Sequence, residues 1–405
     1  MKANAILMIV MVGLCTVLRG DCPPGDMNRD CRVDAADLLL FAHEWLADLP
    51  SPADLDRTGR VDGMDLALFA DSWRQAGCPI VINEVLAHAH AEAPDWIEIY
   101  NVSSIPVDIG GWFLSDAEND LQRYEIAAGT IVEPNGYVVF YETTHFGNPY
   151  DPGVRVPFAF SENGEGAYLY SGDDPVFPNY LASELFGASE TSFSFGRHRK
   201  STGDYTFVTM REMTPGRANA YPLVGPVVIN EIMYHPAGNA DAEYIELLNI
   251  SNGSVTLFDF ASGEPWRLLD ESGVSFYFPT DVPVTLEPRE HLLLARDLVA
   301  VRQYQIPVDA KVFDWGSGKL ANQGERLQLI KPGDVDDKGT RYWIEVDRVT
   351  YSDGSHGEGF AGGIDPWPAE ADGDGSSLNR LFPSRYSDDP NNWHATIPTP
   401  GSVND

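Results

Sequence analysis

The sequence predicts a mainly β protein, in which two β-sandwiches follow one small all-α unit. Three observations indicate this fold class. An acidic loop followed by an apolar helix pattern occurs twice within residues 26–74. From residue 79 onward, short runs rich in Val, Ile, Tyr and Phe alternate with Gly, Pro, Asn and Asp clusters, which is typical of strands and turns. These runs recur in two copies, so we expect three units at 22–78, 79–221 and 226–405.

Residues 1–20 have the features of an export signal. Lys2 supplies a positive start, residues 5–18 are apolar, and a cleavage site before Asp21 follows. We therefore expect a secreted or cell-surface protein. A retained membrane anchor is the alternative, although the stretch is short for a span. No later segment is long and apolar enough to enter a bilayer, so no membrane insertion is expected after signal removal.

Two twelve-residue acidic windows, 26–37 and 54–65, have the ligand spacing of an EF-hand calcium loop. Each places side-chain oxygen at positions 1, 3, 5, 9 and 12 and leaves position 7 to offer a backbone carbonyl. We predict two Ca²⁺ ions, the arginines binding through their carbonyls. The alternative is a pair of solvated acidic loops that bind no metal. The predicted ligands are Asp26, Asn28, Asp30, Arg32, Asp34 and Asp37 in the first loop, and Asp54, Asp56, Thr58, Arg60, Asp62 and Asp65 in the second.

The segment behind each loop predicts one amphipathic helix. Apolar residues recur at i, i+3, i+4 and i+7 in both segments, which forms one apolar face per helix. We expect the two faces to bury against each other and bound metal to contribute much of the folding energy of so small a unit. The residues of the two faces are Leu38, Phe41, Ala42 and Trp45, and Leu66, Phe69, Ala70 and Trp73.

On these loops and helices, residues 22–78 resemble a type I dockerin, an EF-hand-like docking module of secreted bacterial assemblies. The resemblance implies calcium-dependent docking to a cohesin-like domain. It departs from the family pattern at Cys31, where position 6 is expected to be glycine, and at Thr58, which is a weak ligand. Positions 10 and 11, which often set partner choice in that family, do not identify a partner here. They are Ala35 and Ala36 in the first loop and Gly63 and Met64 in the second.

Three cysteines remain after signal removal, namely Cys22, Cys31 and Cys78. An oxidising compartment favours one disulfide among them. Three thiols cannot all pair within the chain, and the sequence leaves open which two do so.

The β region repeats its opening, a second strand and its closing. Residues 81–85 (VINEV) match 228–232 (VINEI), and 96–101 (WIEIYN) match 244–249 (YIELLN). Both copies close on a Thr-Pro-Gly, at Thr214 and at Thr399, followed by Asn219 or Asn404. Many short strands with turn signals between them predict two packed antiparallel sheets per copy.

These motifs, together with GWFLSD at 111–116, resemble lamin tail domains, which have an immunoglobulin-like fold. The second copy departs from the family at 265–270, where PWRLLD stands. The resemblance implies two immunoglobulin-like sandwiches with a non-catalytic role in adhesion, presentation or binding. Because fold does not fix function, this role is an analogy.

The charge and the motifs exclude some classes of function. Acidic residues outnumber basic ones by 61 to 27, and the resulting net charge of −34 repels phosphate backbones, so we expect no nucleic-acid partner. We find no catalytic motif and expect no enzyme. Glycoside hydrolysis stays open, because Glu84, Glu98, Glu231 and Glu246 recur on strands and paired carboxylates cleave glycosides. A structural role for these four is favoured, because they belong to a domain-wide repeat.

Binding of an extracellular glycan is the main alternative function. Six tryptophans can stack on sugars if they are exposed in a row, and otherwise fill the sandwich cores. His88 and His90 share one face of an extended segment but lack an evident third metal ligand, and His356 and His394 have the character of loop residues. The six tryptophans are Trp112, Trp266, Trp315, Trp343, Trp367 and Trp393.

Overall fold

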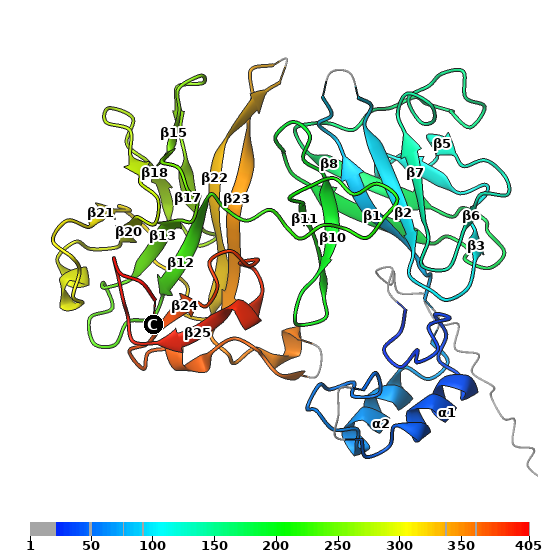
Figure 1. Cartoon of the computed structure of the whole chain (residues 1–405), viewed down its shortest axis with the longest axis horizontal. Coiled ribbons are helices and arrows are strands. Elements are labelled where there is room, and N and C mark those ends of the chain that lie inside the picture. Colours follow the sequence, from blue (N-terminus) through cyan, green and yellow to red (C-terminus); the bar gives the residue numbers. More distant parts are fainter. Residues whose placement is uncertain are drawn as a thin grey trace, which may run out of the picture.

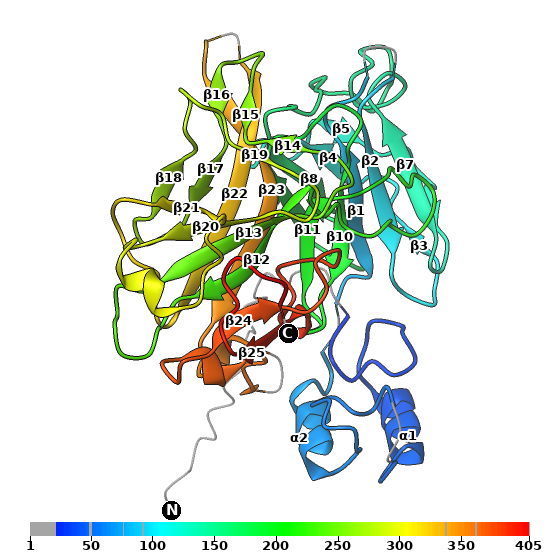
Figure 2. The same cartoon turned by 60° about the vertical axis from the view of Figure 1, so that its left-hand side comes forward.

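The computed structural model describes residues 22–47, 51–75, 77–90, 93–336, 338–360 and 363–404. It confirms the mainly β, sandwich-like fold (Figure 1). Two β units lie side by side, and two helices lie below the first unit in both views (Figures 1 and 2). The predicted export signal lies outside the described residues. In the described part of the chain, no helix has the length and apolar character needed to cross a membrane.

Two nine-residue helices follow the acidic windows, α1 (Ala35–His43) and α2 (Gly63–Asp71). Each begins at an aspartate N-cap, Asp34 or Asp62, whose side chain accepts a hydrogen bond from a backbone amide of the first turn. The carboxylate of the aspartate three positions later accepts a hydrogen bond from the N-cap amide, which completes a capping box at each helix. Both helices therefore begin with the same N-terminal hydrogen bonds, made by residues that repeat in the sequence.

The two helices meet through one aromatic pair. Phe41 and Phe69 are buried, with ring centroids 5.1 Å apart. Val33 and Val61, at position 8 of each loop, and Ala53 complete this small core.

The expectation that the whole apolar faces bury against each other is wrong. Between 38% and 42% of each of Leu38, Trp45, Leu66 and Trp73 remains exposed. The helices are only two and a half turns long, and the loop valines occupy the rest of the core. A substantial part of each stripe therefore stays accessible to solvent.

The first sandwich packs a five-stranded sheet, ordered β11-β10-β1-β2-β7, against a four-stranded sheet, ordered β5-β4-β8-β9, with β3 and β6 paired beside them. Its core includes Ile82, Ile97 and Ile99. Ile97 and Ile99 alternate with Glu98 along β2, and on β1 the pairing register shifts between Ile82 and Glu84. The strands are β1 (Ile80–Leu86), β2 (Trp96–Asn101), β3 (Val107–Asp108), β4 (Phe113–Ser115), β5 (Tyr124–Glu125), β6 (Ile131–Val132), β7 (Tyr137–Tyr141), β8 (Glu165–Tyr170), β9 (Leu181–Phe186), β10 (Phe195–Arg199) and β11 (Tyr205–Thr209).

The second sandwich repeats this plan with a six-stranded sheet, ordered β21-β20-β13-β12-β24-β25, and a four-stranded sheet, ordered β18-β17-β22-β23. Ile229, Ile245 and Leu247 occupy the core positions of the matching isoleucines. Its strands of the larger sheet are β12 (Val227–Met233), β13 (Tyr244–Asn249), β20 (His291–Ala295), β21 (Lys311–Asp314), β24 (Ser377–Arg380) and β25 (Trp393–Thr396). Those of the smaller sheet are β17 (Arg267–Leu269), β18 (Ser275–Tyr277), β22 (Gly324–Val335) and β23 (Arg341–Ser352).

Short elements complete the second sandwich. Two strand pairs and several 3-10 turns join the longer strands. They are β14 (Val255–Thr256) with β19 (Thr285–Leu286), β15 (Phe258–Asp259) with β16 (Glu264–Pro265), and the turns η1 (Ala300–Gln303), η2 (Gly357–Gly359), η4 (Ala369–Ala371) and η5 (Pro390–Asn392).

The three units touch one another. The β10–β11 hairpin packs against the second sandwich, where Val208 and Met210 contact Tyr386. The helical unit contacts the first sandwich at two places: Ser104 donates its amide to the carbonyl of Arg29 at 2.7 Å, and Arg57 donates to the carbonyl of Ser201 at 2.6 Å.

Candidate functional site

Both acidic loops adopt the same unusual backbone. Positions 4 and 6 have positive φ in each, at +61° for Arg29 and Cys31 and at +59° and +87° for Arg57 and Gly59. This left-handed conformation is the reason that EF-hand loops favour glycine at position 6. Cys31 adopts it despite its side chain, so the departure from the glycine pattern leaves the loop geometry intact.

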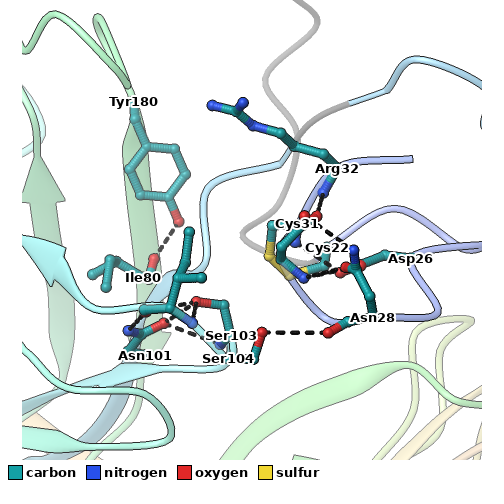
Figure 3. Close-up of a disulfide and its surroundings, with 12 residues drawn as sticks. Cys22, Asp26, Asn28, Cys31, Arg32, Ile80, Asn101, Ser103, Ser104 and Tyr180 are labelled. Atoms are coloured by element: carbon teal, nitrogen blue, oxygen red, sulfur yellow. Dashed lines mark hydrogen bonds between the residues drawn. A yellow bond between two sulfur atoms is a disulfide. The ribbon is translucent and has the colours of Figure 1, made fainter. Parts of the chain in front are cut away.

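A disulfide joins Cys22 to Cys31, which answers the question that the sequence left open (Figure 3). The bond ties the chain just before the first loop to position 6 of that loop. Cys78 is buried and free, and burial raises the pKa of its thiol to about 12.

The position-12 aspartate closes each loop onto its own start. Asp37 Oδ1 accepts hydrogen bonds from the amides of Met27 and Asn28 at 2.8 and 3.1 Å. Asp65 Oδ1 accepts the equivalent bonds from Leu55 and Asp56 at 2.6 and 3.1 Å. In both loops, the position-12 carboxylate therefore bonds the amides of positions 2 and 3, as the sequence repeat predicts.

In the second loop, three predicted ligands point into one small volume. Carboxylate oxygens of Asp54, Asp56 and Asp65 all lie within 4.8 Å of one another. The buried Asp54 Oδ1 has no hydrogen-bond partner in the described structure. A buried oxygen without a donor is costly, and a cation would satisfy it. Thr58 instead donates its hydroxyl to Asp56 at 2.8 Å, and Asp62 caps α2.

The first loop is more closed upon itself. Asp26 accepts hydrogen bonds from the amides of Asp30 and Cys31, and the Asn28 amide group donates to Asp30 at 3.1 Å. Burial raises the pKa of the Asp26 carboxyl, the backbone amides of Cys31 and Asp30 oppose this, and the negative charges of Asp37 and Asp30 add to it. Within the described ranges, this loop shows no group of three carboxylate oxygens as close as that of the second loop.

The repeated glutamates form buried pairs across neighbouring strands. Glu84 on β1 lies opposite Glu98 on β2, and Glu231 on β12 lies opposite Glu246 on β13; all four are buried. We call each pair, with the closing Thr-Pro-Gly that binds it, a carboxylate clasp. In the first clasp Thr214 donates its amide to Glu84 at 3.0 Å, and the amide of Gly216 donates to Glu98.

The second clasp repeats these bonds with residues far along the chain. Thr399 donates its amide to Glu231 at 3.0 Å, and Gly401 donates to Glu246 at 2.6 Å. Asn404 adds a bond from its side chain to the carbonyl of Asn230 at 3.0 Å. The clasps give the opening Val-Ile-Asn-Glu and the closing Thr-Pro-Gly one shared structural purpose, which is to satisfy two buried carboxylates in each sandwich.

The strands that open both sandwiches match a known family. The sequence profile of the Lamin Tail Domain family matches residues 74–176 and 222–353, which is more than half of the chain. The chain belongs to the Lamin Tail Domain family. A search of curated proteins found no match. Residues 22–73 lie outside the matched segments, so the resemblance to dockerins stays a prediction.

Each lamin tail domain extends beyond its matched segment. In the first domain, β9, β10 and β11 follow the match, and in the second β24 and β25 do. The residues that close each clasp lie in these extensions. The internal sequence repeat therefore indicates where each domain ends, beyond the segments that the family profile matches.

The tryptophans do not form the exposed row that sugar stacking requires. Five of the six are buried in the lamin tail domains, namely Trp112, Trp266, Trp315, Trp367 and Trp393. The guanidinium of Arg267 covers the ring of Trp343 at 3.4 Å from its centroid.

One cavity of about 450 Å³ opens on the first lamin tail domain. Its lining includes Gln122, Arg155, Tyr170 and Asp173, which are polar groups suited to a hydroxyl-rich ligand. The indole of Trp112 also lines it, but donates its N–H to Asp174 at 3.0 Å.

The helices and the turns that follow them expose several large apolar side chains, which we call together the helical apolar surface. It contains residues from both helices and from the turns that follow them. Its members are Leu38, Leu39, Leu40, Trp45, Leu46, Met64, Leu66 and Trp73.

Proposed function

We propose that this is an exported, non-catalytic protein in which residues 22–78 form a calcium-dependent, dockerin-like docking unit for a cohesin-like partner. The observation that carries the proposal is the second acidic loop, where three carboxylates converge and a buried oxygen of Asp54 lacks a donor. The tandem lamin tail domains would serve adhesion or binding beside this unit.

Calcium fits the donors better than a softer metal. Every predicted side-chain ligand offers oxygen, and Ca²⁺ takes six to eight oxygens in flexible geometry. The position-12 aspartates also bond loop amides, so ion binding and loop closure reinforce each other. The predicted set is the one given above, with the Arg32 and Arg60 carbonyls at position 7.

The helical apolar surface is the proposed contact for the partner. Exposed apolar side chains concentrated on so small a unit are typical of a protein-binding surface. The two helices pack together through Phe41 and Phe69. The side chains of the helical apolar surface therefore stay exposed, where a folded partner domain can cover them.

Export is supported by the disulfide. Cys22 and Cys31 are joined, and disulfides persist in oxidising compartments outside the cytoplasm. Together with the export-signal pattern of residues 1–20, this favours an extracellular or cell-surface location.

A chelator tests the calcium proposal on the full chain. We expect hydrogen exchange to accelerate at least tenfold in residues 22–75 when calcium is removed, while β1, β2, β12 and β13 keep their protection. Calorimetry should count two ions per chain, and Asp54→Ala should remove one. Asp71→Ala, at the far end of α2, removes the same charge outside the loops and should keep both. Absence of calcium uptake by the wild-type chain would refute the proposal.

Binding to purified cohesin domains tests the docking proposal. We expect calcium-dependent binding that Leu39→Asp and Met64→Asp weaken at least tenfold, because both place a charge on the helical apolar surface. Val308→Asp, on an exposed residue of the second sandwich, is the matched control and should bind normally. Equal binding by all three variants would show that the partner uses another surface.

Glycan binding is a second candidate function, favoured by the polar cavity of the first lamin tail domain. A glycan array with the wild-type chain and Arg155→Ala tests it, because Arg155 lines the cavity and its guanidinium lies 4.6 Å from the Phe113 ring centroid. Loss of a specific glycan signal in the variant would support the candidate, and absence of any signal would remove it.

A further inference from the structure

A second group of metal-type ligands lies in the second lamin tail domain, far in sequence from the acidic loops. Donor atoms of Asp353, His356 and Asp365 lie within 4.8 Å of one another. All three belong to the long connection that follows β23. The two aspartates are buried, and His356 is partly exposed.

The two carboxylates are held in fixed orientations. Asp365 accepts hydrogen bonds from the amide of Trp367 at 3.0 Å, the hydroxyl of Ser352 at 2.5 Å and the amide of His356 at 3.1 Å. Asp353 accepts from the amide of Ser355 at 2.8 Å, and the His356 ring nitrogen lies 3.0 Å from it. Such supporting bonds are typical of ligands that are positioned in advance.

The start of the connection packs closely against residues that follow Asp365. Gly354 has φ of +82°, and a Cβ there would approach the Trp367 carbonyl and the Ala369 Cβ to 2.8 Å. Only glycine fits this position without a shift. This close packing places the residue after Asp353 against residues that lie just beyond Asp365.

An independent observation comes from Tyr234, which follows β12. Its side chain is 0% exposed, and its hydroxyl has no hydrogen-bond partner in the described part of the chain. Burial raises the pKa of this phenol, and the charges of Asp372, Asp353 and Asp365 raise it further. These carboxylates are therefore near enough to act on the phenol, yet its hydroxyl donates to none of them. A buried hydroxyl without an acceptor is uncommon, and a bound ion with its water would supply one.

We propose that Asp353, His356 and Asp365 bind a divalent transition-metal ion, for which Zn²⁺ is the best fit. One imidazole and two carboxylates are ligands that Zn²⁺ accepts, whereas Ca²⁺ takes oxygen alone. Donor atoms that all lie within 4.8 Å of one another can surround one ion with bonds of about 2.0–2.2 Å after small adjustments.

The ion would act as a cross-link within the domain. It would join the start of the connection, at Asp353 and His356, to Asp365 near the core residue Trp367. Tyr234 would face the ion or its bound water from the end of β12. The site is separate from the acidic loops and does not depend on the docking proposal.

The test is a zinc titration of the full, metal-stripped chain in saturating calcium, so that the acidic loops are occupied. We expect one zinc ion per chain by calorimetry, with a matching metal content after dialysis. His356→Ala should weaken zinc binding at least a hundredfold, and Asp365→Asn at least tenfold. Tyr234→Phe removes only the hydroxyl and should weaken binding about tenfold, as supporting residues around metal sites do.

His90→Ala is the matched control, because His90 is an exposed histidine outside the cluster. The zinc affinity of this variant should equal that of the wild type. Circular dichroism of each variant without metal checks that the fold is retained. No saturable zinc uptake by the wild-type chain, or equal uptake by His356→Ala, would overturn the proposal.

Discussion

At the scale of single residues, the buried glutamates determine how each lamin tail domain responds to pH. Burial raises the pKa of Glu98 to about 7, opposed by bonds from Gly216 and Asn83 and aided by the charge of Glu84. Burial and the charge of Glu246 likewise raise the pKa of Glu231 to about 7. A carboxyl with a raised folded-state pKa contributes stability that is complete below its unfolded value, 4.5, and is lost as the pH rises toward 7.

We therefore predict that Glu98→Gln flattens the pH dependence of the first sandwich. In the wild type the contribution of Glu98 to the free energy of unfolding should fall by about 2 kcal/mol between pH 4.5 and 7.5. Thermal melts across this range measure the effect. Glu133→Gln removes an exposed carboxyl and should melt with the wild-type pH dependence; if both variants behave alike, the clasp carboxyl is not the titrating group.

Sequence reasoning found the glutamates but not their partners. Their recurrence in both copies marked them as structural, and the Thr-Pro-Gly segments were recognised as the ends of the repeats. The bond between the two motifs spans more than a hundred residues, from Glu84 to Thr214, and no local pattern encodes it. The sequence places His356 in a loop but does not reveal its ligand partner Asp365, because the two residues meet only after the connection folds.

At the scale of elements, helix start and loop closure depend on one side chain in each acidic loop. Asp65 accepts from the amides of Leu55, Asp56 and Asp62, so it closes the loop and completes the capping box of α2. The sequence predicted both helices because capping and periodicity are local. It overestimated their burial, since periodicity gives the width of an apolar face but not how much of it a partner covers.

Asp65→Ala should destabilise α2 even without metal. We expect a loss of about 1–2 kcal/mol from the missing cap and loop bonds. Hydrogen exchange of the α2 amides in calcium-free buffer measures it, and Asp71→Ala serves as control because Asp71 ends the helix. If the α2 amides of the two variants are equally protected from hydrogen exchange, the stability of α2 comes from its packing alone.

At the scale of the whole molecule, the two lamin tail domains are joined by specific contacts rather than by a linker alone. Tyr386 of the second domain is buried against His198 and Tyr221 of the first, and its amide donates a hydrogen bond to the Tyr221 hydroxyl oxygen at 2.8 Å. Arg348 donates to Thr206 across the same boundary at 3.2 Å. The sequence pattern of either domain alone does not predict complementary surfaces of this kind.

Tyr386→Ala should uncouple the two domains. Loss of a buried aromatic at the boundary is expected to cost about 3 kcal/mol and to split unfolding into two calorimetric transitions. Tyr150→Ala, which removes an almost fully exposed ring from the first domain, should leave the wild-type profile unchanged. A wild-type profile for Tyr386→Ala would mean that the domains already unfold independently.

The carboxylate clasps have a mechanical consequence. Each one fastens the beginning of a sandwich to its end, so tension applied along the polypeptide is shared between the sheet pairing of β1 or β12 and the bonds Thr214–Glu84 or Thr399–Glu231. In a protein tethered at one extremity and loaded at the other, these bonds would add to the force that unfolding of each sandwich requires. Acid, by protonating their carboxylates, would change this force.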